Sequence, residues 1–253
     1  MCELLGMSAN VPTDVCFSFS GLIRRGGVTG PHKDGWGITF YEGKGCRTFL
    51  EPKAGAYSEI ARLVQEYPIK SKTVIAHIRR ANIGAVCLEN THPFTRELWG
   101  ENWTFAHNGR LLGIKKKKLT YYRPVGTTDS EHAFCWVLDT FRRRFSRKPA
   151  AKVLRSLLRD LLNELNRLGI CNVLLSDGKI LYGYCSTSLH YITRKAPFGR
   201  ATLIDKDWQV DFQKETSSRD VVTVIATRPL TNNEDWELIS PGELKAFLDG
   251  NLI

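Results

Sequence analysis

The sequence predicts an α+β domain with mostly antiparallel β-sheet. Segments with the apolar pattern of β-strands precede, separate and follow three segments with helical periodicity. Turn signals rich in Gly, Asp and Asn connect neighbouring strand-like segments, which is typical of hairpins. The sequence contains no internal repeat and no Pro/Ser-rich linker, so we expect residues 1–253 to form a single domain.

The first fifth of the chain contains a candidate hairpin. Residues 2–20 are mostly apolar and lead to a basic, glycine-rich turn at residues 24–27. Residues 36–41 alternate like a strand, and residues 42–45 have the glycine-containing pattern of a tight turn that leads into residues 46–50.

The next part predicts a helix and two buried strands. Apolar residues recur at helical spacing between Tyr57 and Tyr67, and Pro68 ends this element. Residues 73–78 form an apolar run typical of a buried strand, and residues 104–107 form a shorter one that ends at Asn108-Gly109.

Two further helices and three strands complete the pattern. Thr128, followed three residues later by Glu131, has the spacing of a capping box that opens a helix. A second helix carries a leucine stripe and places Gly169 at its expected C′ position. We interpret both apolar faces as core-packing surfaces. A hairpin at residues 171–184 and a buried strand at residues 221–226 follow. The apolar helix positions are Ala133, Phe134, Val137, Leu138 and Phe141, then Leu154, Leu157, Leu158, Leu161, Leu165 and Leu168.

Composition limits the class of protein. Of the 253 residues 42% are hydrophobic and 25% charged, as in ordinary globular proteins, and no run reaches the 18 apolar residues of a membrane-spanning helix. The start has no pattern of a signal peptide. The seven cysteines are odd in number and contain no CxxC pair, so we expect a reducing, cytoplasmic location.

The net charge of +10 is concentrated in one stretch. Residues 110–169 contain fifteen Lys/Arg and five Asp/Glu, which accounts for the whole excess. Lys115 to Lys118 with Tyr121-Tyr122-Arg123 mix cations and aromatic rings, as single-strand nucleic-acid binders do. We favour a solvated face over nucleic-acid binding, because no recognised nucleic-acid-binding motif accompanies it; docking of an acidic partner protein is a further alternative.

Four short segments carry residues that could support catalysis, and each has an ordinary structural alternative. Cys2 could be a small residue at a frayed end, and Arg79 after a strand could be a solvated charge. Asn108-Gly109 could be a turn, and Asp129 could simply cap a helix. However, removal of Met1 would make Cys2 the N-terminal residue, whose α-amine, with a pKa of about 7.7–8.0, can take the proton of its own thiol.

These segments together resemble the type 2 glutamine amidotransferases of the N-terminal nucleophile (Ntn) hydrolase superfamily. The motifs follow the order found in that family, and the last ones are similar to the stand-alone bacterial YafJ-type branch. They are Cys2, DGWG (34–37), AHIRRA (76–81), THPF (91–94), FAHNG (105–109), TTDSE (127–131), LLSDG (174–178) and IATRPLT (225–231) with Trp236. The resemblance therefore covers nearly the whole chain.

The resemblance implies a four-layer αββα sandwich and a defined site. Cys2 would attack the side-chain amide of glutamine, giving a γ-glutamyl thioester and ammonia. The Asn108 side chain and the Gly109 N–H would stabilise the oxyanion. Arg79 would bind the α-carboxylate of glutamine, and Asp129 its α-ammonium group.

The resemblance has departures. Members fused to sugar-phosphate synthases have an aromatic residue after the clamp arginine and Thr-His shortly beyond, whereas this chain has Arg80 and then Asn82-Ile83. The pocket rim therefore differs, which leaves room for another γ-glutamyl substrate. The motifs use the whole chain, so we expect ammonia to be released or passed to a separate acceptor protein. A catalytically inactive relative that binds RNA or protein through residues 110–169 is the other alternative.

Cofactor and metal motifs are missing from the sequence. The six histidines and seven cysteines have no metal-ligand spacing, and the glycine-rich turns do not form a phosphate loop. We interpret His77 and His107 as oriented core histidines, and we find no electropositive motif around the internal cysteines.

Overall fold

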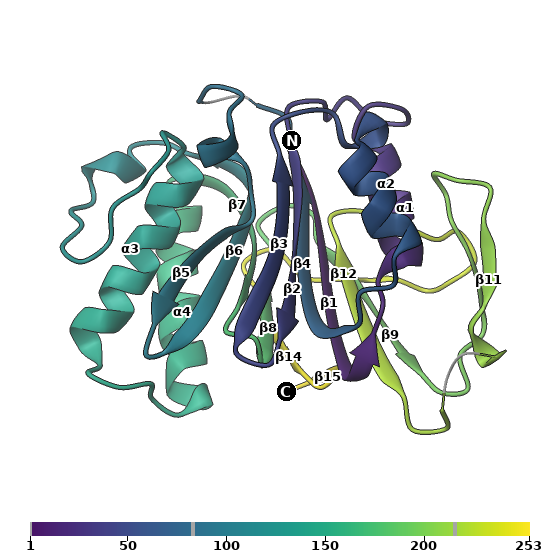
Figure 1. The fold of residues 1–253 in the computed structure, drawn as a ribbon. Coiled ribbons are helices and arrows are strands. Elements are labelled where there is room, and N and C mark those ends of the chain that lie inside the picture. The colour runs from purple at the N-terminus through teal and green to yellow at the C-terminus, as the bar shows by residue number, and fades with distance from the viewer. Residues whose placement is uncertain (1, 82–83, 215–216) are drawn as a thin grey trace.

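Two antiparallel β-sheets pack face to face between two pairs of helices in the computed structural model, which describes residues 2–81, 84–214 and 217–253 (Figure 1). The helices are α1 (Cys16–Arg24), α2 (Glu59–Glu66), α3 (Asp129–Arg144) and α4 (Ala151–Asn166). Short 3₁₀ turns lie at Gly55–Tyr57, Leu88–Asn90, Ile114–Lys116 and Phe212–Lys214.

The larger sheet has seven strands in the order β13-β9-β12-β1-β4-β2-β3. Its strands are β1 (Glu3–Thr13), β2 (Trp36–Glu42), β3 (Gly45–Glu51), β4 (Ser71–Ile78), β9 (His190–Lys195), β12 (Val221–Ala226) and β13 (Glu237–Leu238). The N-terminal strand β1 is central and pairs with β4 on one side and β12 on the other. This position explains its nearly continuous apolar sequence, because both of its faces are buried.

The smaller sheet has six strands in the order β15-β14-β8-β7-β6-β5. Its strands are β5 (Phe94–Leu98), β6 (Glu101–Leu111), β7 (Gly169–Ser176), β8 (Ile180–Tyr184), β14 (Leu244–Leu248) and β15 (Asn251–Leu252). A separate two-stranded ribbon consists of β10 (Arg200–Thr202) and β11 (Gln209–Asp211). The predicted α+β class with mostly antiparallel sheets is confirmed.

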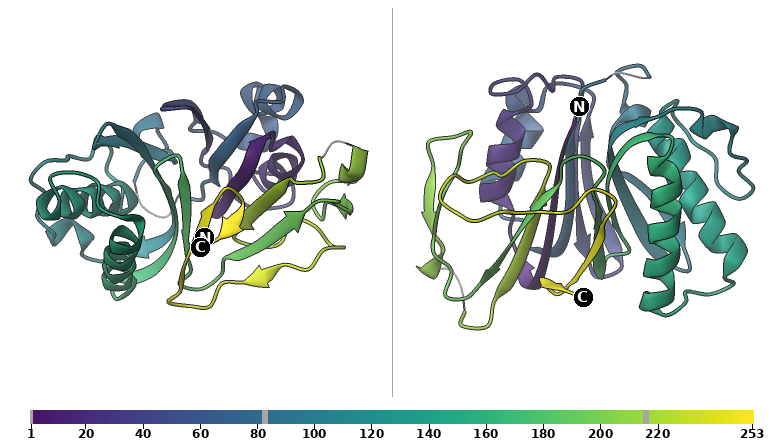
Figure 2. Two further views of the ribbon diagram at one scale, coloured as in Figure 1. Left: turned by 90° about the horizontal axis from the view of Figure 1, so that it is seen from below. Right: turned by 180° about the vertical axis from the view of Figure 1, so that it is seen from behind.

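Three hydrophobic cores hold the layers together. One core joins α1 and α2 to the larger sheet, a second joins α3 and α4 to the smaller sheet, and a third lies between the sheets. On β1, Leu4 faces the other sheet, whereas Leu5 and Met7 face the helices. Figure 2 shows the helix pairs on opposite outer sides of the two sheets. The four-layer αββα sandwich that the resemblance implied is therefore confirmed.

Most predicted elements are present, with three corrections. Asn108 and Gly109 do not form a turn, because they lie inside β6 opposite Asn172 and Cys171 of β7. The spacing between Tyr57 and Tyr67 does give α2, but both tyrosines are exposed and only Ala61 and Val64 of this helix are buried.

The third correction concerns Gly169, which does not cap α4. The helix ends at Asn166 with Arg167 as its C-cap, and Gly169 is already the first residue of β7. A Cβ at Gly169 would lie 2.2 Å from the carbonyl oxygen of Arg110. The glycine is therefore needed for the close approach of β7 to β6. Separately, no helix in the described part of the chain is long and apolar enough to cross a membrane.

Candidate active site

The predicted site residues come together at one end of the sandwich. Cys2 precedes β1, and Arg79 follows β4, the strand paired with β1. Gly109 lies near the end of β6 in the other sheet, and Asp129 is the first residue of α3. Cys2, Arg79, Gly109 and Asp129 line one small cavity. Segments from both sheets and from one helix thus meet at the start of the chain (Figure 1).

The Cys2 thiol is half-buried and faces the backbone of Arg80. The Arg80 N–H donates to Cys2 Sγ at 3.3 Å, and Sγ lies 3.5 Å from the Arg80 carbonyl oxygen. Burial raises the pKa of the Cys2 thiol, and the Arg80 N–H partly offsets this effect. The thiol therefore needs a base to become a nucleophile near neutral pH. Met1, whose removal we expect, lies outside the described residues.

Arg79 is fixed by the DGWG motif. The Asp34 N–H donates to the Arg79 carbonyl at 3.1 Å, and the Arg79 N–H donates to the Gly35 carbonyl at 2.7 Å. The Asp34 carboxylate also accepts from the Ala81 N–H at 2.8 Å. The guanidinium donates to the Ala85 carbonyl at 3.0 Å, and Arg79 is only 3% exposed. A motif distant in sequence therefore places a buried cation beside Cys2.

Asn108 and Gly109 sit in the β6–β7 ladder under tight constraints. A Cβ at Gly109 would lie 1.8 Å from the Ile170 carbonyl oxygen, so only glycine fits there. Asn108 is fully buried and is not among the residues that line the cavity. Neither polar atom of its side-chain amide has a hydrogen-bond partner among the described residues. Such an amide is unusual, because buried polar groups are nearly always paired.

Asp129 combines a structural contact with a position at the cavity. Its carboxylate accepts from the Leu111 N–H at 2.7 Å and from the Ser130 N–H at 3.0 Å. The capping role falls to Thr128, whose hydroxyl accepts from the Glu131 N–H at 3.1 Å as the sequence predicted. The Glu131 carboxylate does not complete a capping box, because it accepts from the N–H groups of Val125 and Gly126.

The cavity has a volume of about 30 Å³, which is the space of roughly one water molecule. The lining also includes six residues that sequence reasoning did not assign to the site, namely Arg80, His92, His107, Arg110, Thr128 and Ser130. Arg80 was noted as a departure from the family pattern. His92 was part of a quoted motif, and Arg110 was counted only in the basic stretch.

The histidines near the cavity are buried. His107 Nδ1 lies 2.8 Å from Ser130 Oγ, and its Nε2 lies 3.1 Å from the Ile170 carbonyl, as expected of an oriented core histidine. The His77 ring stacks on His92 with 4.3 Å between ring centroids. Burial lowers the pKa of His77 to about 3 and that of His92 well below its usual range. Both rings are therefore neutral at physiological pH.

Some cations of the basic stretch (residues 110–169) form ion pairs within the fold, whereas many others are exposed. Lys117 pairs with Glu164 and stacks on Trp136, and Lys148 pairs with Glu101 and Asp177. Many of the other cations are exposed on the loop after β6 and on α3 and α4. Cys2, Arg79 and the oxyanion candidates lie outside this stretch. In the part of the chain that the structure describes, no group of three or more potential metal ligands gathers, and all seven cysteines are free.

Comparisons with known proteins agree with this geometry. The family model of class-II glutamine amidotransferases matches residues 1–253. The chain is 62% identical over its full length, and over all of the relative, to the protein named "Putative glutamine amidotransferase YafJ" from Escherichia coli strain K12. It is 45% identical, over all of this chain and 86% of the relative, to a protein from Haemophilus influenzae with a similar name.

Solved structures give the same picture. The crystal structure of a "predicted glutamine amidotransferase" from Pseudomonas aeruginosa matches with a TM-score of 0.80 and 52% identity, covering 100% of this chain and 99% of that one. The glutamine phosphoribosylpyrophosphate amidotransferase of Bacillus subtilis matches with a TM-score of 0.65 and 14% identity, over 48% of its length. At that identity the second likeness shows the fold alone.

Proposed function

Since the chain belongs to the class-II glutamine amidotransferases, we propose that it cleaves the side-chain amide of glutamine through a thioester on Cys2, releasing glutamate and ammonia. The observation that carries this proposal is the convergence of Cys2, Arg79, Gly109 and Asp129 on one cavity. They lie in or next to four separate elements, and together they would supply a nucleophile, a cation, an oxyanion donor and an anion. The proposal treats residues 1–253 as one glutaminase domain, and its seven free thiols suit the reducing cytoplasm.

The nucleophile needs no second side chain in this proposal. After loss of Met1, the α-amine of Cys2 takes the thiol proton, and the thiolate attacks the amide carbon of glutamine. The C–N bond breaks as the tetrahedral intermediate collapses, and the α-ammonium returns its proton to the leaving ammonia. Water, deprotonated by the same amine, then attacks the thioester and releases glutamate with the thiol restored.

Two donors would stabilise the oxyanion of that intermediate. Gly109 lines the cavity, and the Asn108 amide is buried with no other partner among the described residues. An unpaired buried amide is costly in the resting protein, but it needs no reorganisation when the oxyanion forms. Loss of one such donor typically raises the barrier by about 2.7–4 kcal/mol.

The amino-acid end of glutamine would lie between two fixed charges. Arg79 offers a planar guanidinium to the α-carboxylate, and Asp129 offers a carboxylate to the α-ammonium group. Both side chains are at least nine-tenths buried, so their charges are poorly screened by water. Both are also anchored to the backbone, which holds the pair in place before substrate binds.

An affinity label tests this proposal. A glutamine analogue with a diazoketone in place of the amide should alkylate Cys2 of the Met1-processed protein, with loss of N₂, and glutamate should protect it. Peptide mapping should find the other six cysteines unlabelled. Half-buried Cys16 is the matched comparison, because burial raises its thiol pKa to about 12. Labelling of Cys16, or none at Cys2, would count against the proposal.

A second substrate is favoured by the two extra cations at the cavity. Arg80 and Arg110 line it together with Arg79, whereas Asp129 is the one acidic residue among the described residues of the lining. A γ-glutamyl compound whose leaving amine carries a carboxylate would place that carboxylate near these cations. We therefore propose such compounds as the alternative to glutamine itself.

The two substrates are separated by kcat/KM. If γ-glutamylglycine is the better substrate, the double variant Arg80→Ala/Arg110→Ala should lower its kcat/KM at least tenfold and leave that of glutamine nearly unchanged. Arg123→Ala is the control, because this exposed cation of the basic stretch does not line the cavity. An equal loss for both substrates would contradict the alternative.

A further inference from the structure

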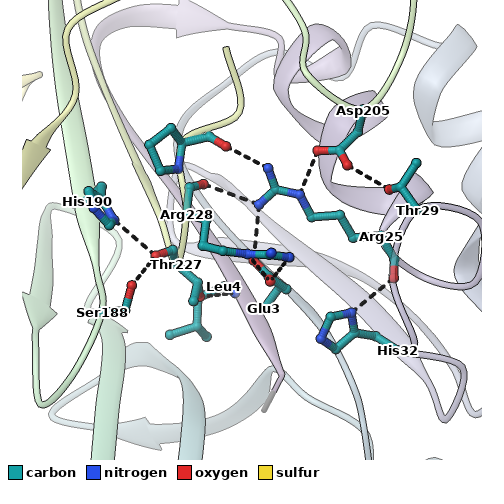
Figure 3. Close-up of polar contacts among 11 residues, drawn as sticks. Glu3, Leu4, Arg25, Thr29, His32, Ser188, His190, Asp205, Thr227 and Arg228 are labelled. Carbon is teal, nitrogen blue, oxygen red and sulfur yellow. Dashed lines mark hydrogen bonds and ion pairs between the residues drawn. The ribbon is translucent and has the colours of Figure 1, made fainter. Parts of the chain in front are cut away.

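A buried ion-pair network holds the residue that follows Cys2 (Figure 3). The Glu3 carboxylate accepts from Arg25 Nη1 at 3.1 Å through one oxygen. Its other oxygen accepts from Arg228 Nε at 2.8 Å and lies 2.6 Å from Arg228 Nη2. The side chains of Glu3 and Arg25 are each only 4% exposed. Glu3 is thus clamped between two guanidinium groups.

Arg25 is itself immobilised by further contacts. Its Nε donates to Asp205 at 2.7 Å, and its Nη2 donates to the Pro229 carbonyl at 2.6 Å. Nη1 also lies 3.2 Å from the Arg228 carbonyl, so the backbone of the second arginine joins the network. Thr29 donates to the other oxygen of Asp205 at 2.6 Å. Two carboxylates face two guanidiniums, which balances the charge that burial makes costly.

The next residue, Leu4, is held through its backbone. Its N–H donates to Thr227 Oγ1 at 2.9 Å, and its carbonyl accepts from the Thr227 N–H at 3.2 Å. The Thr227 carbonyl in turn accepts from Ser188 Oγ at 2.8 Å and lies 3.0 Å from His190 Nδ1. Figure 3 shows these contacts converging on the start of β1.

Cys2 itself has few anchors. The sheet register of β1 begins at Glu3, opposite Ile78, and pairing with β12 begins only at Leu5. Among the described residues, the hydrogen bonds of Cys2 are those between its sulfur and the Arg80 backbone. Chain ends fray unless they are tied down, whereas a catalytic group must keep its place within about 0.5 Å.

We propose that Glu3, Arg25, Asp205 and Arg228 form a positioning network that holds the N-terminal nucleophile in the site. None of the four lines the cavity, so they are positioning residues that act through the backbone of β1. The expected effect of breaking the network on turnover rests on the proposed function. The expected effect on the exposure of the Cys2 thiol does not, because releasing the chain end must change that exposure whatever the substrate is.

The alternative is that the network only stabilises the fold. A comparable ion pair elsewhere in the chain separates the two roles. Arg194 of β9 binds Glu234 through two hydrogen bonds of 2.6 Å each, with side chains 9% and 14% exposed. Glu234 also accepts a hydrogen bond from the Thr231 hydroxyl, and the Arg194 guanidinium lies over the Phe212 ring. These residues are far along the chain from Cys2. Glu234→Ala therefore removes a similar ion pair without touching the start of β1.

Peptide-resolved alkylation of the folded, Met1-processed protein tests the proposal. Iodoacetamide is applied briefly at pH 7, and the rate is measured for each cysteine by mass spectrometry. In Glu3→Ala the alkylation of Cys2 should rise at least fivefold, because the thiol gains exposure and loses the burial that raises its pKa. Buried Cys135, Cys171 and Cys185 should stay protected, since they report global unfolding.

Three further variants keep the test decisive. Glu3→Gln should give a smaller rise, because the amide oxygen still accepts from one guanidinium. Arg228→Ala should raise the Cys2 rate about two- to fivefold, and the 57% exposure of this side chain makes it a safe variant if Glu3→Ala does not fold. Glu234→Ala should leave the Cys2 rate within twofold.

An unchanged or slower rate at Cys2 in the Glu3 and Arg228 variants would overturn the proposal. So would a rise that the three buried cysteines share, because it would show a purely structural role. With an active substrate, Glu3→Gln should also lower kcat about tenfold or more and change KM less than twofold. If wild-type protein has no turnover, the proposed function fails, while the alkylation result still decides the positioning role.

Discussion

Asp129 accepts a hydrogen bond of 2.7 Å from the backbone N–H of Leu111, so the first residue of α3 is tied to the last residue of β6. Asn108 and Gly109 lie just before Leu111 on the same strand. This contact therefore sets the separation between the group proposed for the α-ammonium of the substrate and the groups proposed for the oxyanion. The carboxylate keeps a helix in place and still lines the cavity.

Asp129→Asn should separate these two roles. The amide oxygen can still accept from Leu111, but the negative charge for the α-ammonium group is lost. A hydrogen bond to a charged group contributes about 1.5–3 kcal/mol. We expect kcat/KM for glutamine to fall roughly 10- to 150-fold, mainly through KM, as measured by steady-state kinetics.

Asp139→Asn is the control for that variant. Asp139 lies on the same helix and accepts from the N–H groups of Thr120, Tyr121 and Tyr122. It does not line the cavity, so its variant should lower the melting temperature and leave KM nearly unchanged. Equal effects of the two variants on KM would contradict the role given to Asp129.

Asn108→Ala should lower kcat about 10²- to 10³-fold with little change in KM, because it removes an oxyanion donor. Its effect on stability should be small, since the amide atoms have no partner among the described residues to lose. Thermal unfolding and steady-state kinetics of the same sample measure both effects.

Asn172, directly opposite in the ladder, gives the matched comparison. Its side chain donates to the Asn108 carbonyl and to Thr187, and it accepts from the Ser186 and Thr187 N–H groups. Asn172→Ala should therefore unfold at a clearly lower temperature than Asn108→Ala. The reverse order would show that the Asn108 amide has a structural partner.

Gly109→Ala should destabilise the fold as well as the site. The new Cβ would lie 1.8 Å from the Ile170 carbonyl oxygen, so β6 and β7 must move apart. Overpacking of this kind costs about 3 kcal/mol, which lowers the melting temperature by roughly 6–12 °C for a chain of this size. Gly199→Ala, with nothing within 4 Å of its Cβ, should melt like the wild type.

Stability should fall in mild acid because of the buried histidines. Burial lowers the pKa of His77 to about 3, below its usual value of 6.5. Between about pH 6.5 and pH 3, His77 is therefore protonated in the unfolded chain but neutral in the folded protein. This contribution to stability is complete above pH 6.5 and is lost as the pH falls towards 3, by up to about 1.4 kcal/mol per pH unit.

His77→Phe should flatten this pH dependence. Urea unfolding at pH 7 and pH 5 gives the loss of unfolding free energy for each protein. The loss should be smaller in the variant, because one group no longer gains a proton on unfolding. The same loss in both proteins would show that His77 is accessible to protons in the fold.

Elements with a strong local signal could be predicted from the sequence. The N-cap at Thr128 starts α3, and the leucine stripe forms the buried face of α4. The helix α1 was not predicted, because CFSFSGLIR is apolar on nearly every side and Val15 supplies no side-chain cap. Asn108-Gly109 has the composition of a turn, yet long-range pairing with β7 holds it in a strand.

The site could be predicted only in part, for a related reason. The resemblance supplied the order of motifs, and the fold then brought Cys2, Arg79, Gly109 and Asp129 to one cavity. Arg110 was not predicted there, because nothing local distinguishes it from other cations of the basic stretch. Glu3 and Arg228 are 225 positions apart, so no sequence pattern indicates that they pair.

The most direct test of the account is the release of glutamate from glutamine and γ-glutamylglycine by the Met1-processed protein, with its N-terminus verified by intact mass. The wild-type protein should release glutamate, Cys16→Ala should match it, and Cys2→Ala should release none. Glutamate release that persists in Cys2→Ala would contradict the central claim, as would verified wild-type protein that hydrolyses neither compound.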